Sequence, residues 1–165
     1  MKHISILLAA AVILFGVAAQ AQTTHHSDAS FVTKAAEGGM AEVRMAQLAQ
    51  GKAQSQAVKD LANRLYNDHM KAGDELKAIA SKDNITWPSA MSLKQQREYN
   101  KLQALSGADF DREYVHYQIR DHKEDIAEFE HEANHGMNAG VKAWASKNLS
   151  TLRDEIGRAS CRERV

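Results

Sequence analysis

The feature that most constrains the fold is a set of four long segments whose apolar residues recur every three or four positions. Such spacing places apolar side chains along one face of an α-helix, whereas a strand has a period of two. The chain has one proline, Pro88, and it lies outside all four segments. We therefore predict an all-α fold with long helices over residues 28–50, 55–82, 108–134 and 138–155.

The apolar stripes of these helices predict the core. Steps of three and four residues favour long helices that pack about 20° from parallel, so we expect a four-helix bundle. In chain order, the stripes comprise Phe31, Ala35, Gly38, Glu42, Met45 and Ala49; Val58, Ala62, Leu65, His69, Ala72, Leu76 and Ile79; Val115, Ile119, His122, Ile126, Phe129 and Ala133; and Val141, Ala145, Leu149 and Leu152.

The connections between the helices predict how the bundle is wound. Short links at Gly51 and Gly136 make the first two and the last two long helices antiparallel hairpins. The long connector that begins at Asp83, with a short extra helix over 92–105, lets the second hairpin cross over and dock on the first. The pair Gly38-Gly39 would cost about 1 kcal/mol per residue inside a helix. We expect close approach of a neighbouring helix to compensate for it.

Residues 1–21 are typical of a secretory signal peptide. A positive start precedes an uncharged apolar run that ends at Ala19-Gln20-Ala21, the small-x-small pattern of a cleavage site. The run is shorter than the roughly 20 residues of a membrane-spanning helix, which disfavours the alternative of an uncleaved anchor. We predict cleavage after Ala21, export to the periplasm or beyond, and no transmembrane span in the mature chain. Residues 22–27 are predicted to be a polar linker.

The last ten residues, 156–165, differ in composition from the helix before them. They contain the only cysteine, Cys161, and resemble a translated sequencing adapter. We predict that this string is not native and set it apart from the domain, which then spans 28–155; a genuine disordered tail is the alternative. The domain itself has no cysteine and therefore no disulfide.

The charge balance argues against nucleic acid as a partner. The chain has 21 Lys and Arg residues and 21 Asp and Glu residues. A protein that binds a phosphate backbone needs a basic excess, which is absent here.

Several motifs in order suggest a family. They are Phe31-Val32, the run from Glu37 to Val43 (Glu-Gly-Gly-Met-Ala-Glu-Val), Asp68-His69, the run from Phe110 to Tyr114 (Phe-Asp-Arg-Glu-Tyr), and Asp121-His122. Together they resemble the ferritin-like domain-of-unknown-function family of secreted bacterial proteins, often labelled as outer-membrane or exported proteins. The resemblance covers nearly the whole mature domain. It implies a ferritin-like helical bundle in the cell envelope and brings no activity with it.

Three polar residues, Glu42, His69 and His122, fall on otherwise apolar stripes. Each lies near the middle of its helix, so all three are expected to meet at mid-height in the bundle. A buried carboxylate is costly unless it is paired or binds a cation. Carboxylate and imidazole ligands suit iron, zinc or manganese, so these residues are the candidate metal ligands.

A purely structural role is the main alternative for these residues. Two buried histidines can hydrogen-bond a glutamate or a tyrosine and only fix the helix register. Asp68 and Asp121 are expected to cap a helix, pair with lysine or face solvent rather than share a metal. A dinuclear iron site is not expected, because the Glu-x-x-His pairs all lie on one helix: Glu113/His116, Glu128/His131 and Glu132/His135.

Two classes of function follow. The first is a non-enzymatic envelope protein that binds another protein or an envelope component, in a stress response for example. The second is a metal-binding or redox protein built on the Glu/His cluster. The sequence has no glycine-rich phosphate loop and no nucleophile beside an activating base, so no catalytic residue is assigned.

Overall fold

A computed structural model describes residues 21–163, with side chains from 28 to 161. The predicted signal peptide therefore lies almost entirely outside the described residues. Within them, every regular element is a helix, which confirms the all-α prediction. The elements are α1 (Ala21–Lys52), α2 (Gln56–Lys82), α3 (Leu93–Ala104), α4 (Gly107–His135) and α5 (Ala139–Glu163). None of these helices is long and apolar enough to cross a membrane.

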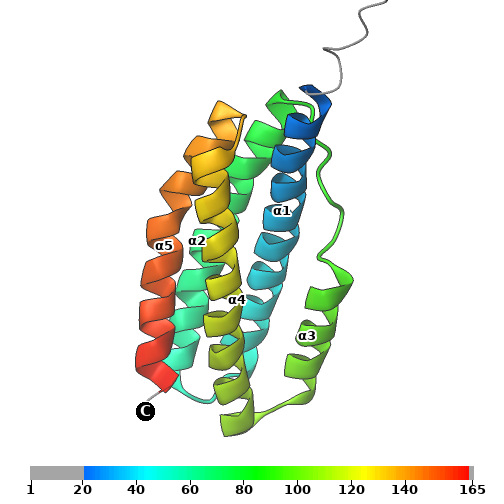
Figure 1. The fold of residues 1–165 in the computed structure, drawn as a ribbon. Coiled ribbons are helices and arrows are strands. Elements are labelled where there is room, and N and C mark those ends of the chain that lie inside the picture. The colour runs from blue at the N-terminus through cyan, green and yellow to red at the C-terminus, as the bar shows by residue number, and fades with distance from the viewer. Residues whose placement is uncertain (1–20, 164–165) are drawn as a thin grey trace, which may run out of the picture.

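The four long helices stand side by side as two antiparallel hairpins, α1 with α2 and α4 with α5 (Figure 1). Contacts of α2 with α5 and of α1 with α4 close the ring. The short helix α3 packs on the outside, against α1 and α4. The predicted hairpins, crossover and extra helix are all present.

Helix α3 is held by its own capping and by one buried residue. Ser92 and Gln95 form a capping box, in which each side chain bonds the other residue's backbone N–H. Such a box satisfies two N–H groups that the first turn leaves without a partner. Leu102 is fully buried in the core. The connector is thus fixed against the bundle at a defined place.

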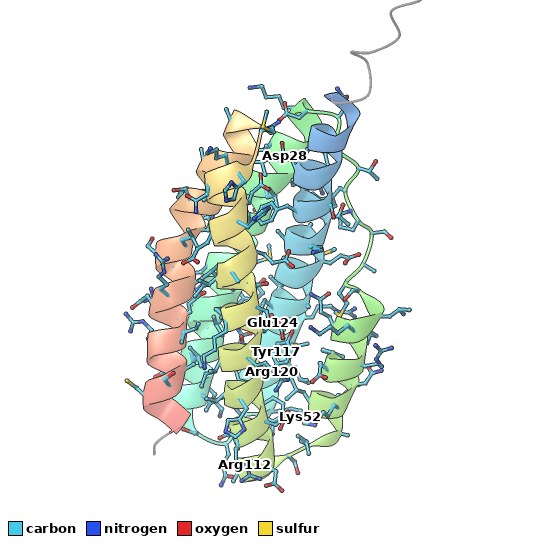
Figure 2. All side chains as sticks on the ribbon, viewed as in Figure 1. Asp28, Lys52, Arg112, Tyr117, Arg120 and Glu124 are labelled. Atoms are coloured by element: carbon cyan, nitrogen blue, oxygen red, sulfur yellow. The ribbon has the colours of Figure 1, made fainter. Side chains whose placement is uncertain are left out.

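Two aspartates fasten the hairpins to each other at opposite ends of the bundle. Asp111, at the start of α4, accepts backbone N–H bonds of 3.0 and 2.7 Å from Gln54 and Ser55, in the link between α1 and α2. Asp28 of α1 accepts bonds of 3.1 and 2.7 Å from Met137 and Asn138, in the link between α4 and α5. Figure 2 shows Asp28 at the end of the bundle far from the start of α4. Each hairpin therefore caps the turn of the other.

Both ends of the bundle run further than predicted. Helix α1 begins at Ala21, so the segment 22–27, predicted as a linker, continues the helix backbone. No proline or glycine lies in that segment to stop it. Helix α5 continues to Glu163, and Ala159 is buried in the core because it lies one turn after Glu155 on the same face. Part of the string 156–165 therefore packs in the core of this structure, while its non-native origin and the domain boundary at 155 stay predictions.

The expectation for Gly38-Gly39 is also wrong. A Cβ built on Gly38 would meet only the side-chain nitrogen of Gln95, at 3.6 Å, and one on Gly39 would meet nothing within 4 Å. No long helix approaches closely at this place, so packing does not explain the pair.

We expect the substitution Asp111→Ala to lower the free energy of unfolding by about 1–3 kcal/mol, because two backbone donors lose a charged acceptor. The matched control is Asp109→Ala, which removes an exposed ion pair with Arg112 on the same turn and should cost less than about 0.5 kcal/mol. Urea denaturation of both variants provides the measurement, and equal losses would contradict the capping role.

Candidate metal centre

A buried polar layer crosses the middle of the bundle. Each long helix contributes one residue: Glu42 from α1, His69 from α2, His122 from α4 and Glu155 from α5. The apolar core is divided into two clusters, one toward the α1–α2 link and one toward the α4–α5 link. On α2, for example, Leu65 belongs to the first cluster and Leu76 to the second.

The register of the helices explains this layer. His69 lies four residues after Leu65, and His122 lies seven residues before Phe129, so both continue an inward-facing stripe. The predicted meeting of the histidines is present, with ring centroids 5.5 Å apart and the rings edge to face.

The first group of polar atoms comprises His69, His122 and Glu155. The Nε2 atom of His122 lies 3.0 Å from a Glu155 carboxylate oxygen, and the Nε2 atom of His69 lies 3.7 Å from the same oxygen. The side chains of His122 and Glu155 are each 1% exposed, and that of His69 is 12% exposed. One potential ligand atom from each residue lies within 4.8 Å of the others.

Burial and pairing act in opposite directions in this group. Burial by itself raises the pKa of Glu155, but the interactions with His122 and His69 outweigh it and lower the pKa to about 2. Burial likewise lowers the pKa of His69, but the carboxylate of Glu155 outweighs it and raises the pKa to about 9. At neutral pH, in the metal-free protein, His69 is therefore an imidazolium and Glu155 a carboxylate.

The second group comprises Glu42, Asp121 and His122, again with one ligand atom each within 4.8 Å. Glu42 is fully buried, and neither of its oxygens has a hydrogen bond of ordinary geometry. Burial raises the pKa of this carboxyl well above its usual value; nearby His69 opposes the rise and Asp121 adds to it. A buried carboxyl of this kind gains most from a cation.

Buried hydroxyl and amide groups surround the second group. The hydroxyls of Tyr114 and Tyr117 and both side-chain polar atoms of Gln118 are buried without a hydrogen bond of ordinary geometry. Burial, with the charge of Glu42, raises the pKa of both tyrosines, so they stay protonated and remain donors. The structural role considered for the sequence pairs the histidines with a glutamate or a tyrosine, and the 3.0 Å contact between His122 and Glu155 is a pair of that kind.

Asp121 is not where the sequence analysis placed it. It was expected to pair with a basic residue or face solvent, yet its carboxylate approaches Glu42 and His122. Adjacent positions differ by about 100° around a helix, yet Asp121 and His122 of α4 both have a potential ligand atom near Glu42 of α1. Asp68 pairs with an arginine rather than a lysine, because Arg64, one turn earlier on α2, lies 3.3 Å from its carboxylate. His131 and His135 are exposed and lie outside the cluster.

Glu155 is the functional candidate that sequence reasoning missed. It was treated as the last residue of the domain, where a charged side chain is ordinarily solvated. The available signal was spacing, since Glu155 lies three residues after Leu152 on the stripe of the last helix. Its burial became evident only with the continuation of α5 beyond it.

The donor set suits a transition-metal ion. Ligands of a tetrahedral ion with bonds of 2.0–2.1 Å lie about 3.4 Å apart. The separations of 3.0 and 3.7 Å around the Glu155 oxygen bracket that value. Two imidazoles and one carboxylate are ligands that zinc and ferrous iron accept. Of the three residues that the sequence singled out, His69 and His122 join Glu155 in the first group, whereas Glu42 approaches only His122, in the second group.

The family model for a domain of unknown function, DUF4142, matches residues 15–160. This chain belongs to the DUF4142 family. The resemblance to a domain-of-unknown-function family is thereby confirmed, while its ferritin-like and secreted aspects stay predictions. No curated protein matches the sequence.

Solved structures share the fold of this DUF4142 protein. A DUF305 fragment from Deinococcus radiodurans superposes with a TM-score of 0.75 at 17% identity, covering 84% of this chain and 97% of the fragment. CopM in its Cu(II)-bound form gives 0.71 at 17% identity, with 83% and 95% covered. A DUF305 protein from Streptomyces coelicolor, described as secreted, gives 0.70 at 14% identity, with 81% and 88% covered. At such identities the likeness concerns the fold.

The pKa shifts predict how the metal-free cluster stabilises the fold. The stabilising effect of Glu155, whose pKa falls from 4.5 to about 2, is present above pH 4.5 and is lost as the pH falls toward 2. That of His69, whose pKa rises from 6.5 to about 9, is present below pH 6.5 and is lost as the pH rises toward 9. The stability difference between the wild type and Glu155→Gln should therefore be largest between about pH 4.5 and 6.5. Thermal unfolding in chelator from pH 3 to 9 measures it, and a difference independent of pH would contradict the ion pair.

Proposed function

We propose that this DUF4142 protein binds one divalent transition-metal ion in the middle of its bundle, through His69, His122 and Glu155. The observation that carries the proposal is the convergence of two imidazoles and a carboxylate, from three helices, between the two apolar clusters of the core. Zinc and ferrous iron suit these ligands best, and manganese accepts the same donors.

The second polar group supports the proposal. Glu42 and Asp121 place two more carboxylates next to His122, and they supply negative charge close to a bound cation. The oxygens of Glu42 have no hydrogen bond of ordinary geometry to compensate for their burial. An ion at His122 would lower the cost of ionising that carboxyl.

Binding at neutral pH requires His69 to lose its proton, because an imidazolium is not a ligand. Metal binding therefore releases the proton of His69, whereas Glu155 is already ionised and releases none. We therefore expect metal affinity to increase with pH up to about 9, the pKa of His69 in the metal-free protein.

The solved neighbours give further support. CopM structures are described as Ag-bound, Cu(I)-bound and Cu(II)-bound forms, so one protein with this fold holds metal ions. A role as a non-enzymatic binding protein of the envelope is compatible with the site, since binding a metal requires no catalysis.

Elemental analysis of the purified mature domain tests the site. We expect about one equivalent of zinc or iron, and an increase in unfolding free energy of about 2.7 kcal/mol at a metal concentration 100 times the Kd. His122→Ala should weaken binding by at least about 100-fold. The control His131→Ala removes an exposed histidine of the same helix and should leave binding unchanged. A metal-free protein whose melting temperature does not respond to these ions would leave the cluster a structural network that fixes helix register.

We also propose that the protein is exported. The support is the apolar leader with its Ala19-Gln20-Ala21 motif, together with the neighbour from Streptomyces coelicolor that is described as secreted.

When the full chain is expressed in a bacterium with a general secretion system, we expect the periplasmic protein to begin at Gln22. Mass spectrometry of the purified protein identifies that terminus. The variant Ala21→Arg, which places a large charged side chain at the cleavage position, should accumulate unprocessed. Recovery of unprocessed wild-type chain in the cytosol would refute the proposal.

A further inference from the structure

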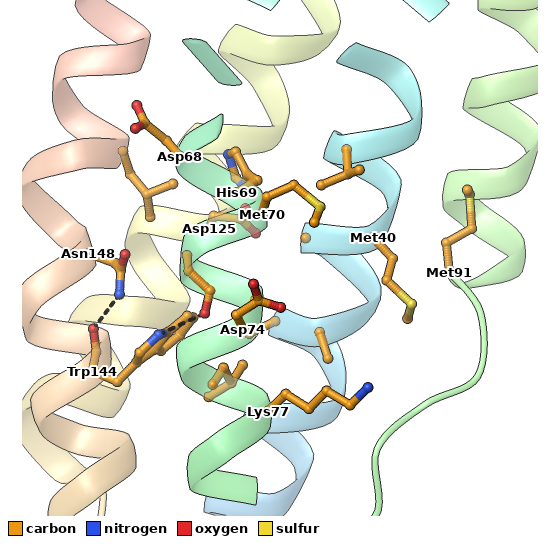
Figure 3. A pocket seen from close by; sticks show the side chains of 18 of the residues that line it. Met40, Asp68, His69, Met70, Asp74, Lys77, Met91, Asp125, Trp144 and Asn148 are labelled. Carbon is orange, nitrogen blue, oxygen red and sulfur yellow. Dashed lines mark hydrogen bonds between the residues drawn. The ribbon is translucent and has the colours of Figure 1, made fainter. Parts of the chain in front are cut away.

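A cavity of about 390 Å³ opens beside the polar layer. Residues of α1, α2, α4, α5 and the connector before α3 line it, and His69 and Glu155 of the cluster are among them; Figure 3 shows His69 beside Asp125. A cavity of this size between the helices of a bundle is within the range of small-molecule sites, and an apolar cavity of about 150 Å³ already takes up benzene.

Two helical glycines keep this cavity open. Gly39 of α1 and Gly73 of α2 both line it, and a Cβ built on either would meet nothing within 4 Å. Glycine destabilises a helix interior, and neither residue allows a neighbouring helix to pack closely. What Gly39 and Gly73 share is that each lacks a side chain where one would point into open space at the cavity.

Most of the wall is apolar and aromatic. Both tryptophans of the chain, Trp87 and Trp144, line the cavity, together with Phe129 and Leu76. The indole N–H of Trp144 donates a bond of 3.1 Å to the backbone oxygen of Ala72, which fixes the ring in place. Rigid aromatic walls of this kind favour a flat ring over a flexible chain, because edge and stacking contacts add to the burial of the ring.

The inner end of the cavity is rich in hydrogen-bond acceptors. Asp125 and Glu155 line the cavity beside His69, and Asp68, which also lines it, has its carboxylate next to Arg64. One oxygen of Glu155 is buried without a hydrogen-bond partner. Because a carboxylate only accepts bonds, a ligand that reaches this end must bring donors.

We propose that this cavity binds a small aromatic molecule that carries hydroxyl groups, with its ring against Trp144 and Phe129 and its hydroxyls directed at the carboxylates of the inner end. This site goes beyond metal binding. Its ligand also lies next to the proposed metal, since His69 and Glu155 belong to both sites.

Catechol is a suitable probe for the cavity. We expect it to bind the metal-free mature protein, in chelator and under nitrogen, with one site by isothermal titration calorimetry. The same titration should change the tryptophan fluorescence, since both tryptophans line the cavity. The comparison compound 1,2-difluorobenzene has the same ring without donors and should bind at least about 10-fold more weakly.

A pocket-filling substitution with a matched control locates the site. Gly73→Leu adds a side chain into the open space and should weaken catechol binding at least 10-fold, and Gly39→Leu should do the same from the opposite helix. The control is Gly51→Leu, because a Cβ at this exposed helical position also meets nothing within 4 Å and the residue lies outside the cavity. It should leave binding within about 2-fold.

The result is independent of the metal proposal, because the titration uses metal-free protein and the glycine variants keep every candidate ligand. Each variant should melt at or above the wild-type temperature, since leucine favours helix over glycine. Absence of catechol binding to the wild type, or equal binding by Gly73→Leu and Gly51→Leu, would overturn the cavity as the site. Equal affinity for catechol and 1,2-difluorobenzene would overturn the role of the carboxylates.

Discussion

The rest of the structure depends on a layer of buried charge in the middle of an otherwise apolar bundle. Glu42, His69, His122 and Glu155 come from four different helices, so the layer forms only when all four helices are in register. Because a buried carboxylate without a partner is strongly destabilising, any shift of one helix along another would separate the charges and be penalised. The apolar stripes supply the driving force for assembly, and this layer selects one alignment among the many that apolar packing alone would tolerate.

The ends of the bundle reinforce the same alignment. Asp28 and Asp111 each accept two backbone N–H bonds from the turn of the opposite hairpin. If one hairpin shifted along the other, these N–H groups would lose their carboxylate acceptor. The two hairpins are therefore fixed relative to each other at both ends as well as in the middle of the bundle. This gives the side chains of the polar layer a defined geometry without a disulfide.

The cavity and the candidate metal centre form one continuous region. His69 faces the cavity and also approaches the carboxylate of Glu155, whereas His122 is sealed behind them. A metal held by these residues would have one side closed by protein and one side toward an aromatic-walled space. Catalytic metal sites differ from structural ones in keeping such an open side. The two proposed sites therefore share His69 and Glu155 within one bundle.

The sequence by itself determined the helices, their hairpin pairing and three of the four residues of the polar layer. These features are local or periodic: a stripe at helical spacing fixes which face is buried, and a short link fixes an antiparallel pair. Glu42, His69 and His122 could be found because each interrupts such a stripe near the middle of a helix.

Tertiary structure alone decided the partners of these residues and the space around them. Glu155 stands at a position that only the packing of α5 shows to be buried, and Asp121 turns inward because α1 lies on that side of α4. The sequence predicts close contact at Gly38-Gly39 of α1, yet a Cβ on Gly39 would meet nothing within 4 Å, and the same holds for Gly73 of α2. A cavity is the volume left between side chains of five segments far apart in the chain, so no spacing along a single segment can indicate it.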